Sequence, residues 1–417
     1  MRIDRWILNP LRFILLIFCA QCAVWYFGMP ENPILPGVAP RYVTPTALSR
    51  YFVLFVALLA GLSLGALLTG FLKRRSRNPI DQDVFLKRLK TLQNIALAAI
   101  LLSILGEIFY IRSIIENPAI LIEAYQEGLV THVAQEVRGN RIVGLSSLNN
   151  LFIVPTTIYA MLTFNPHLAE AARRNFRKKL LVLGIVVAGH AMILSARMFM
   201  LYFLSIVLAA YLLSQRKGIF IKGHYVAAAL ILALLAIWGG ETLRTGLYFS
   251  HQNMLSPFSF EAQQYVWLTL IQGYIASDFN NAMVILNNSP GMQLIATTGF
   301  KSFLDNPVGY HNLPDWVSAH GTVNILGLWW FDWGWFAPLV AITAGFWLGS
   351  TYALAKVGTL PAKWSTLFYL ISFPAIFSAA RINYFGQTIF ILPLFFLCGC
   401  WLIGQLKKGW IWRSKSG

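Results

Sequence analysis

The amino-acid sequence predicts an all-α, polytopic integral membrane protein. Of its 417 residues, 57% are hydrophobic and 12% are charged, which is about half the charged fraction of a typical soluble domain. Apolar segments recur along the whole chain at about the length that a helix needs to cross a hydrocarbon core of roughly 30 Å. No soluble domain separates them, so residues 1–417 are expected to form a single transmembrane domain.

Basic residues gather in clusters between the apolar segments. Cytoplasmic loops of membrane proteins carry an excess of lysine and arginine, so these clusters are expected to mark the cytoplasmic side. The net charge of +17 then reflects topology, and nucleic acid is not an expected partner because no soluble basic domain is visible. The clusters are Lys73–Lys90, Arg173–Lys179, Arg216–Lys222 and Lys407–Lys415.

Counting the apolar segments between the clusters predicts about ten transmembrane helices, with both termini cytoplasmic. One or two further short helices within 262–335 would raise the number to 11 or 12. The expected spans are 9–28, 51–72, 91–111, 143–163, 180–195, 197–214, 223–240, 335–355, 364–380 and 387–405. The expected extracytoplasmic loops are 112–142 and the larger 241–322. No small-residue cleavage site follows the first apolar segment, so it is expected to be retained as a span.

One apolar run, Leu180–Ser214, is too long for a single span. A helix of about 35 residues would be about 52 Å long. Both flanks of the run are basic, so both ends are expected on the cytoplasmic side. We therefore predict two short helices joined by a turn at Ser195–Arg197, which places Arg197 at the outer interface.

Nine basic residues fall outside the cytoplasmic segments of this layout. They are Arg41, Arg50, Arg112, Arg138, Arg141, Arg197, Arg244, Lys301 and Arg381. Three of them, Arg197, Arg244 and Arg381, are expected at the same depth, where a span meets the outer interface. The planar, permanently charged guanidinium suits phosphate oxygens, which favours a site for lipid-linked pyrophosphate. Snorkelling to headgroups or pairing with a loop carboxylate is the alternative.

The segment 241–322 is predicted to form interfacial or re-entrant helices that cap a cavity. Within it, residues 265–286 are apolar but carry scattered amide, hydroxyl and carboxylate groups. Aromatic residues such as Tyr274 are mixed with these polar groups, and sugar rings bind such surfaces by stacking and hydrogen bonding. An aromatic belt at the membrane interface is the alternative explanation.

A polar stretch with two histidines, HNLPDWVSAHGTVN, leads into the apolar segment ILGLWWFDWGWFAPLV. Asp332 and Gly334 interrupt this segment shortly before the span at 335–355. An aspartate at the centre of a membrane helix is costly. Asp332 is therefore expected near the outer end, paired with an arginine or a sugar hydroxyl.

The stretch TVNILGLWWFDWGWFAPLVAITAGFWLG resembles the oligosaccharide repeat-unit polymerases, the O-antigen or Wzy-type polymerases of bacterial envelopes. An arginine that opens a span after a short hairpin (SARMFMLYFLSIVL), and a large outer loop before the last three spans, are similar to the same family. The resemblance runs from the third span to the end of the chain, mostly as architecture. It implies a GT-C-like, O-antigen-polymerase fold in the bacterial inner membrane, with the active site facing the periplasm or exterior.

The resemblance also implies an activity, the en bloc transfer of a growing glycan from undecaprenyl pyrophosphate to a new lipid-linked repeat unit. It assigns the neutralisation of pyrophosphate charge to Arg197, Arg381 and Arg244, and the role of general base to His320. Three other residues stay open as the base, namely His311, Asp315 and Glu136. The residues expected to bind substrate are Arg244, Tyr274, His311, Asp315, Asn324 and Asp332.

No cofactor and no metal ion are expected. The chain has no Walker motif, no GxGxxG after a strand and no HExxH, and its four cysteines lie within predicted spans. The expected partners are the undecaprenyl-pyrophosphate-linked donor and acceptor, the lipid bilayer and, as a further candidate, a chain-length regulator protein.

Three other functions remain open at this point. An O-antigen ligase would use the same chemistry with a different acceptor. A lipid-linked-oligosaccharide flippase or other transporter would favour internal repeats and charges at mid-membrane, and the sequence has neither an evident repeat nor many acids in its spans. A structural scaffold in an envelope glycan complex would not require three outer arginines.

Overall fold

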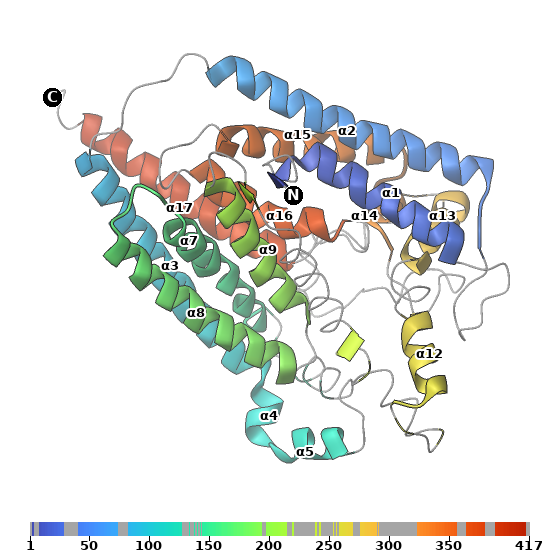
Figure 1. Ribbon diagram of the computed structural model, residues 1–417. Helices are drawn as coiled ribbons and strands as arrows, with labels where there is room; N and C mark the ends of the chain where they lie inside the picture. The colour runs from blue at the N-terminus through green and yellow to red at the C-terminus, as the bar shows by residue number, and fades with distance from the viewer. Residues whose placement is uncertain are drawn as a thin grey trace.

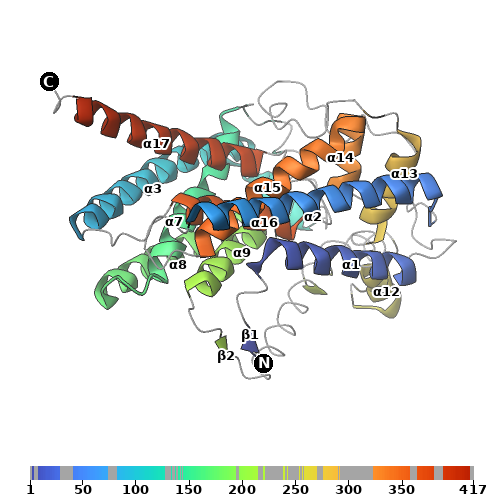
Figure 2. The same cartoon turned by 90° about the horizontal axis from the view of Figure 1, so that it is seen from above.

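The computed structural model describes most of the chain. The described residues are 2–3, 8–28, 41–73, 82–126, 144–193, 197–214, 219–220, 238–239, 258–269, 276–289, 323–356, 364–379 and 388–413, with the single positions 133, 137, 140, 142, 242, 253, 256 and 291. Within these residues the protein is helical, apart from the two-residue strands β1 (Arg2–Ile3) and β2 (Ile219–Phe220). The two strands pair antiparallel beside the N-terminus, to one side of the helices (Figure 2).

Helices of very different lengths make up the described part of the molecule (Figure 1). In chain order they are α1 (Pro10–Gly28), α2 (Pro45–Lys73), α3 (Gln82–Tyr110), α4 (Arg112–Glu116), α5 (Ala119–Gln126), the 3₁₀ helix η2 (Ser146–Phe152), α7 (Ile153–Thr163), α8 (Glu170–Ile193), α9 (Arg197–Ser214), α12 (Phe260–Leu268), α13 (Ser277–Asn288), α14 (Ile325–Trp333), the 3₁₀ helix η7 (Gly334–Phe336), α15 (Ala337–Lys356), α16 (Trp364–Phe377) and α17 (Thr388–Arg413).

Several of these helices have the length and composition of membrane spans. In the described part of the chain, four helical segments are long and apolar enough to cross a bilayer: Pro10–Phe27, Pro45–Gly70, Leu86–Tyr110 and Ile325–Ala355. Shorter apolar helices cover Met198–Ser214, Trp364–Ile376 and Ile389–Gln405. The predicted all-helical class with membrane-crossing helices is therefore confirmed at this level. Every predicted span overlaps a described helix except 223–240, which lies outside the described residues apart from its end.

The long apolar run Leu180–Ser214 is divided between two helices, as predicted. Helix α8 ends at Ile193 and α9 begins at Arg197, and the two helices pack against each other (Figure 1). The rings of His190 on α8 and Phe199 on α9 lie 4.3 Å apart between centroids, so the end of α8 adjoins the start of α9.

Helices α2 and α15 pack closely against each other, and glycines permit it. A Cβ atom added at Gly61 of α2 would lie 2.2 Å from the carbonyl oxygen of Ile342, and one at Gly349 of α15 would lie 2.2 Å from that of Leu62. Small residues four apart let membrane helices approach to backbone contact. The sequence GLSLG at 61–65 on α2 and the matching GFWLG at 345–349 on α15 place these glycines against each other.

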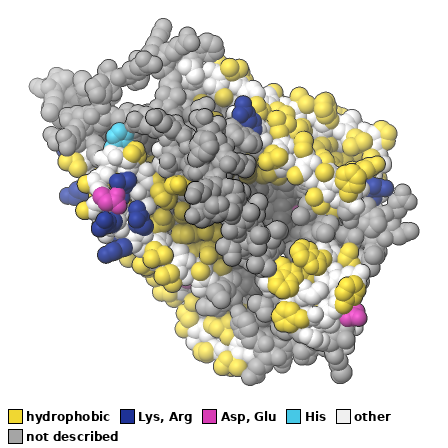
Figure 3. Space-filling view, viewed as in Figure 1, with side chains coloured by type: hydrophobic (Ala, Val, Ile, Leu, Met, Phe, Trp, Pro, Cys, Tyr) yellow, Lys and Arg dark blue, Asp and Glu magenta, His cyan; other side chains and the backbone are white. Residues whose placement is uncertain are grey.

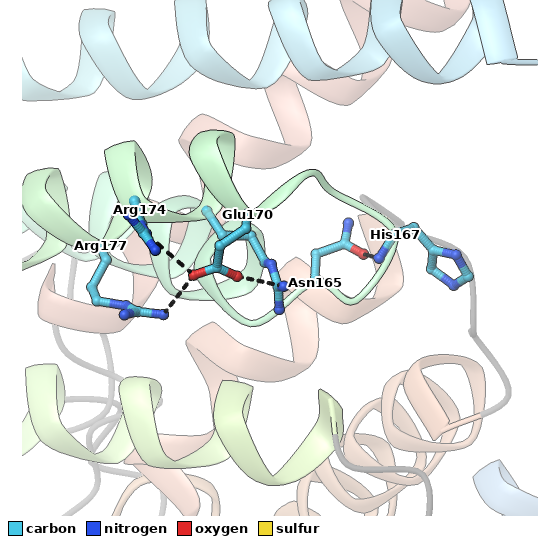
Figure 4. Close-up of polar contacts among 6 residues, drawn as sticks. Asn165, His167, Glu170, Arg174 and Arg177 are labelled. Atoms are coloured by element: carbon cyan, nitrogen blue, oxygen red, sulfur yellow. Dashed lines mark hydrogen bonds and ion pairs between the residues drawn. The ribbon is translucent and has the colours of Figure 1, made fainter.

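The bundle has one strongly basic end. Helices α3 and α8 both begin on the side where the C-terminus lies, in both views (Figures 1 and 2). The first turns of α8 carry five basic residues, and Figure 3 shows such side chains gathered there. Glu170 pairs with three of them, and its carboxylate lies 2.5 Å from Arg173, 3.7 Å from Arg174 and 3.8 Å from Arg177. Figure 4 shows the pairs with Arg174 and Arg177. We call this side the basic end.

The opposite end of the bundle carries exposed aromatic side chains. Tyr26 and Phe27 lie in the last turn of α1, and Trp335 and Phe336 lie in η7, between α14 and α15. Aromatic rings with exposed surfaces are enriched where membrane helices meet the headgroup region. We call this side the aromatic end.

Candidate functional site

Helices α13 and α14 bury an unusual number of polar side chains. Asp278, Asn280 and Asn281 on α13, and Asn324 and Asp332 at the two ends of α14, are all 0% exposed. Buried polar groups are costly unless they are hydrogen-bonded, so a polar layer of this kind must be built as a connected network. It lies toward the aromatic end, since α13 packs against the first part of α2.

Asn280 and Asn324 are the two connecting points of this layer. The Asn280 side-chain oxygen accepts hydrogen bonds from the indole of Trp25 (3.2 Å) and the backbone N–H of Tyr42 (2.7 Å). Asn324 is the N-cap of α14, where its side-chain oxygen accepts from the N–H of Gly327 at 3.1 Å. The layer therefore fixes α1 and the start of α14 to α13.

The start of α14 also lies beside the end of α16. The backbone N–H of Ile325 donates to the carbonyl of Ala379 at 3.0 Å. The backbone thus brings Asn324, predicted to bind substrate, next to the segment that leads to Arg381. Arg381 itself lies outside the described residues.

Asp332 is enclosed at the C-terminal end of α14. The helix ends at Trp333, and Gly334 takes a positive φ of 51°, a conformation that favours glycine. A Cβ added at Gly291 would lie 2.4 Å from the Cα of Gly334, so the absence of a side chain at Gly291 lets its backbone approach the end of α14. The predicted interruption at Asp332–Gly334 is therefore real. The Asp332 side chain contributes to the interior rather than to an exposed surface.

Three of the basic residues predicted outside the cytoplasmic segments have internal partners. Arg50 stacks on the ring of Trp330 at 4.4 Å and donates to the carbonyl of Leu286, near the C-terminal end of α13. Arg41 donates to the carbonyl of Tyr26 at 3.0 Å, near the end of α1, and Arg112 pairs with Glu116 at 2.6 Å. Cations near helix C-terminal carbonyls are stabilising, so Arg50 and Arg41 have a structural explanation.

A second polar cluster joins α3, α8 and η2. Nδ1 of His190 lies 2.6 Å from Oε1 of Glu107, and the amide of Asn149 approaches the other carboxylate oxygen at 3.5 Å. The rings of Tyr110 and Phe199 lie beside the imidazole, at 5.9 Å and 4.3 Å between centroids. We call Glu107, His190 and Asn149 the acid–histidine cluster.

The cluster lies far from the basic end. Along α3, about 30 Å separates Glu107 from Lys87, and along α8, roughly 24 Å separates His190 from Arg174. These lengths approach the thickness of a hydrocarbon core. Arg197 is the first residue of α9, and Phe199, two residues later, contacts the ring of His190. The backbone of Arg197 therefore lies about 3 Å along the helix axis from a residue that touches the cluster.

Most of the predicted site residues lie outside the described part of the chain. For Arg197 the structure describes the backbone, at the start of α9, and not the side chain. The predicted residues outside the described part of the chain are Arg244, Tyr274, His311, Asp315, His320 and Arg381, and the alternative base Glu136 also lies outside it. Arg197, Asn324 and Asp332 are thus the predicted residues that the structure places.

The acid–histidine cluster was not predicted as a unit. A carboxylate within an apolar span was the available signal for Glu107, because ionisable groups at membrane depth are costly and usually functional. Among the described residues, no group of three or more His, Cys, Asp or Glu side chains is arranged to hold a metal ion. The cluster is built from one carboxylate, one imidazole and one amide.

In the described residues the protein is helical, with helices long and apolar enough to cross a membrane. Two sets of polar side chains, the buried layer on α13 and α14 and the acid–histidine cluster, lie away from its basic end. Comparison with family models, with curated proteins and with solved structures found no match to this chain.

Proposed function

We propose that this protein is a bacterial envelope polysaccharide polymerase. It joins undecaprenyl-pyrophosphate-linked oligosaccharide repeat units en bloc at the outer face of the inner membrane. The observation that carries the proposal is the α8–α9 hairpin, which begins α9 at Arg197 beside the acid–histidine cluster and far from the basic end. The resemblance of the stretch 322–349 to repeat-unit polymerases supplies the reaction.

The proposed topology follows from the two ends of the bundle. The basic end faces the cytoplasm, because lysine and arginine are retained there. About ten spans then cross the inner membrane, with both termini in the cytoplasm, and the loops 112–142 and 241–322 face the periplasm. The segment 241–322, of which α12 and α13 are parts, covers the substrate site from that side.

The proposed chemistry needs no nucleotide. A hydroxyl of the acceptor sugar attacks the anomeric carbon of the donor glycan, and the lipid pyrophosphate leaves with the bonding electrons. Arg197 neutralises the charge that builds up on the leaving pyrophosphate, and the positive end of the α9 helix dipole adds to this field. Arg381 and Arg244 are proposed as further phosphate contacts, and a base takes the hydroxyl proton.

The experiment that tests this proposal is analysis of glycans in a strain that lacks the gene. If the protein is a polymerase, long chains disappear in this strain, while single repeat units persist on the lipid carrier or on the final acceptor. Long chains that accumulate on the carrier without attachment would identify a ligase instead. Single repeat units that accumulate on the cytoplasmic face would identify a flippase.

A further inference from the structure

Glu107 and His190 differ sharply in their exposure. The Glu107 side chain is 32% exposed, whereas that of His190 is 8% exposed. Glu107 is also the only carboxylate in the candidate span Leu86–Tyr110. An ionisable side chain inside a membrane span costs free energy and usually has a function. The exposed part of the Glu107 side chain is accessible to a hydroxyl group.

We propose that Glu107 is the base that accepts the proton of the acceptor hydroxyl, and that His190 is a positioning residue that holds the carboxylate. This inference rests on the proposed polymerase activity. It assigns the proton-transfer step to a pair within the helical bundle rather than to a residue of the large outer loop.

The hydrogen bonds of the pair favour this division of roles. Nε2 of His190 is buried, and no hydrogen-bond partner for it lies in the described part of the chain. A buried N–H without an acceptor costs about 1–3 kcal/mol, which favours the tautomer that carries the proton on Nδ1 over the one that carries it on Nε2. A proton on Nδ1 is donated to Oε1 of Glu107, at 2.6 Å.

The second carboxylate oxygen has capacity for a substrate. Oε2 of Glu107 has one described contact, the amide of Asn149 at 3.5 Å, which is at the limit of a hydrogen bond. An ionised carboxylate oxygen accepts more than one hydrogen bond. The acceptor hydroxyl can therefore donate to Oε2 while His190 fixes the other oxygen.

The step balances without a further reactant. The hydroxyl oxygen forms a bond to the anomeric carbon of the donor, and the bond from that carbon to the pyrophosphate oxygen breaks with both electrons leaving on the pyrophosphate. The hydroxyl proton moves to Oε2 of Glu107 and passes to water after the product moves. His190 keeps its Nδ1 proton throughout.

Glu107→Gln tests the base directly, in purified protein that extends lipid-linked repeat units extracted from the deletion strain. Glutamine keeps the size of the side chain and an oxygen that accepts from His190, so the melting temperature is expected to stay near that of the wild type. Loss of a general base lowers kcat by about 10²–10⁴-fold, with KM changed only a few-fold. Glu116→Gln, an exposed carboxylate paired with Arg112, is the control and should leave kcat unchanged.

The positioning role of His190 is tested by a pair of substitutions. His190→Gln keeps a donor toward Glu107 and should retain a larger share of kcat than His190→Leu, with KM unchanged in both. A merely structural role would lower the melting temperature of both variants and would not separate their kcat values.

The outcomes separate this inference from the polymerase assignment. If Glu107→Gln extends repeat units at the wild-type rate, Glu107 is not the base, although the wild-type protein still polymerises. If the wild-type protein extends nothing, the polymerase assignment itself is wrong. If Glu107→Gln is unstable, Glu107→Asp decides the question, because a shorter carboxylate should restore part of kcat, and failure to do so in a stable protein overturns the proposal.

Discussion

Replacing Arg197 by alanine is expected to remove long glycan chains from the cell and leave single repeat units. The guanidinium is assigned to the leaving pyrophosphate, and loss of one donor to a developing anion lowers kcat by about 10²–10³-fold. Such a loss exceeds what a polymerase that acts repeatedly on one chain can tolerate. The measurement is the chain-length ladder of the deletion strain that expresses the variant, with the amount of protein in the membrane determined in parallel.

Arg112→Ala is the matched control for that substitution. Arg112 lies just past the end of α3, but its guanidinium already pairs with Glu116 on the surface. Surface pairs contribute at most about 1 kcal/mol, so its loss should leave the ladder intact. A full ladder from well-expressed Arg197→Ala would contradict the assignment of the pyrophosphate to Arg197, even if the protein is a polymerase.

Gly61→Ala is expected to destabilise the protein strongly. Its Cβ would lie 2.2 Å from the carbonyl oxygen of Ile342, which is backbone and has no rotamer to change. The backbones of α2 and α15 would have to move apart at this contact, and overpacking of this kind typically costs about 1–3 kcal/mol. The measurement is the thermal unfolding midpoint of the purified protein in detergent, together with its elution as a single species.

Gly70→Ala on the same helix is the control. No atom lies within 4 Å of a Cβ added at Gly70, and alanine is the better helix former by up to about 1 kcal/mol. Its unfolding midpoint should therefore be unchanged or raised. Equal midpoints for Gly61→Ala and Gly70→Ala would contradict the close packing of α2 on α15.

Hydropathy and charge placement were sufficient to predict most of the helices. The break between α8 and α9 was predicted because basic residues flank the run Leu180–Ser214 at both ends, a local signal that needs no tertiary information. The close packing of GLSLG at 61–65 on GFWLG at 345–349 was not predicted, because hydropathy does not indicate which two helices meet.

Long-range contacts explain what sequence reasoning missed. Arg50 and Arg41 were predicted only as exceptions to the charge rule, because the carbonyls to which they donate lie 236 and 15 positions away in the chain. Glu107 and His190 are 83 positions apart, and nothing in the sequence links the two positions. The pair exists only because α3 and α8 end at the same level.

Extension of lipid-linked repeat units by the purified protein in liposomes tests the central claim most directly. The substrate is the lipid-linked single repeat unit isolated from the deletion strain, and the products are separated by length. A polymerase predicts chains of two, three and more repeat units, with undecaprenyl pyrophosphate released for each bond formed and no nucleotide added. Unchanged single repeat units, from a protein that is folded and correctly inserted, would contradict the polymerase assignment.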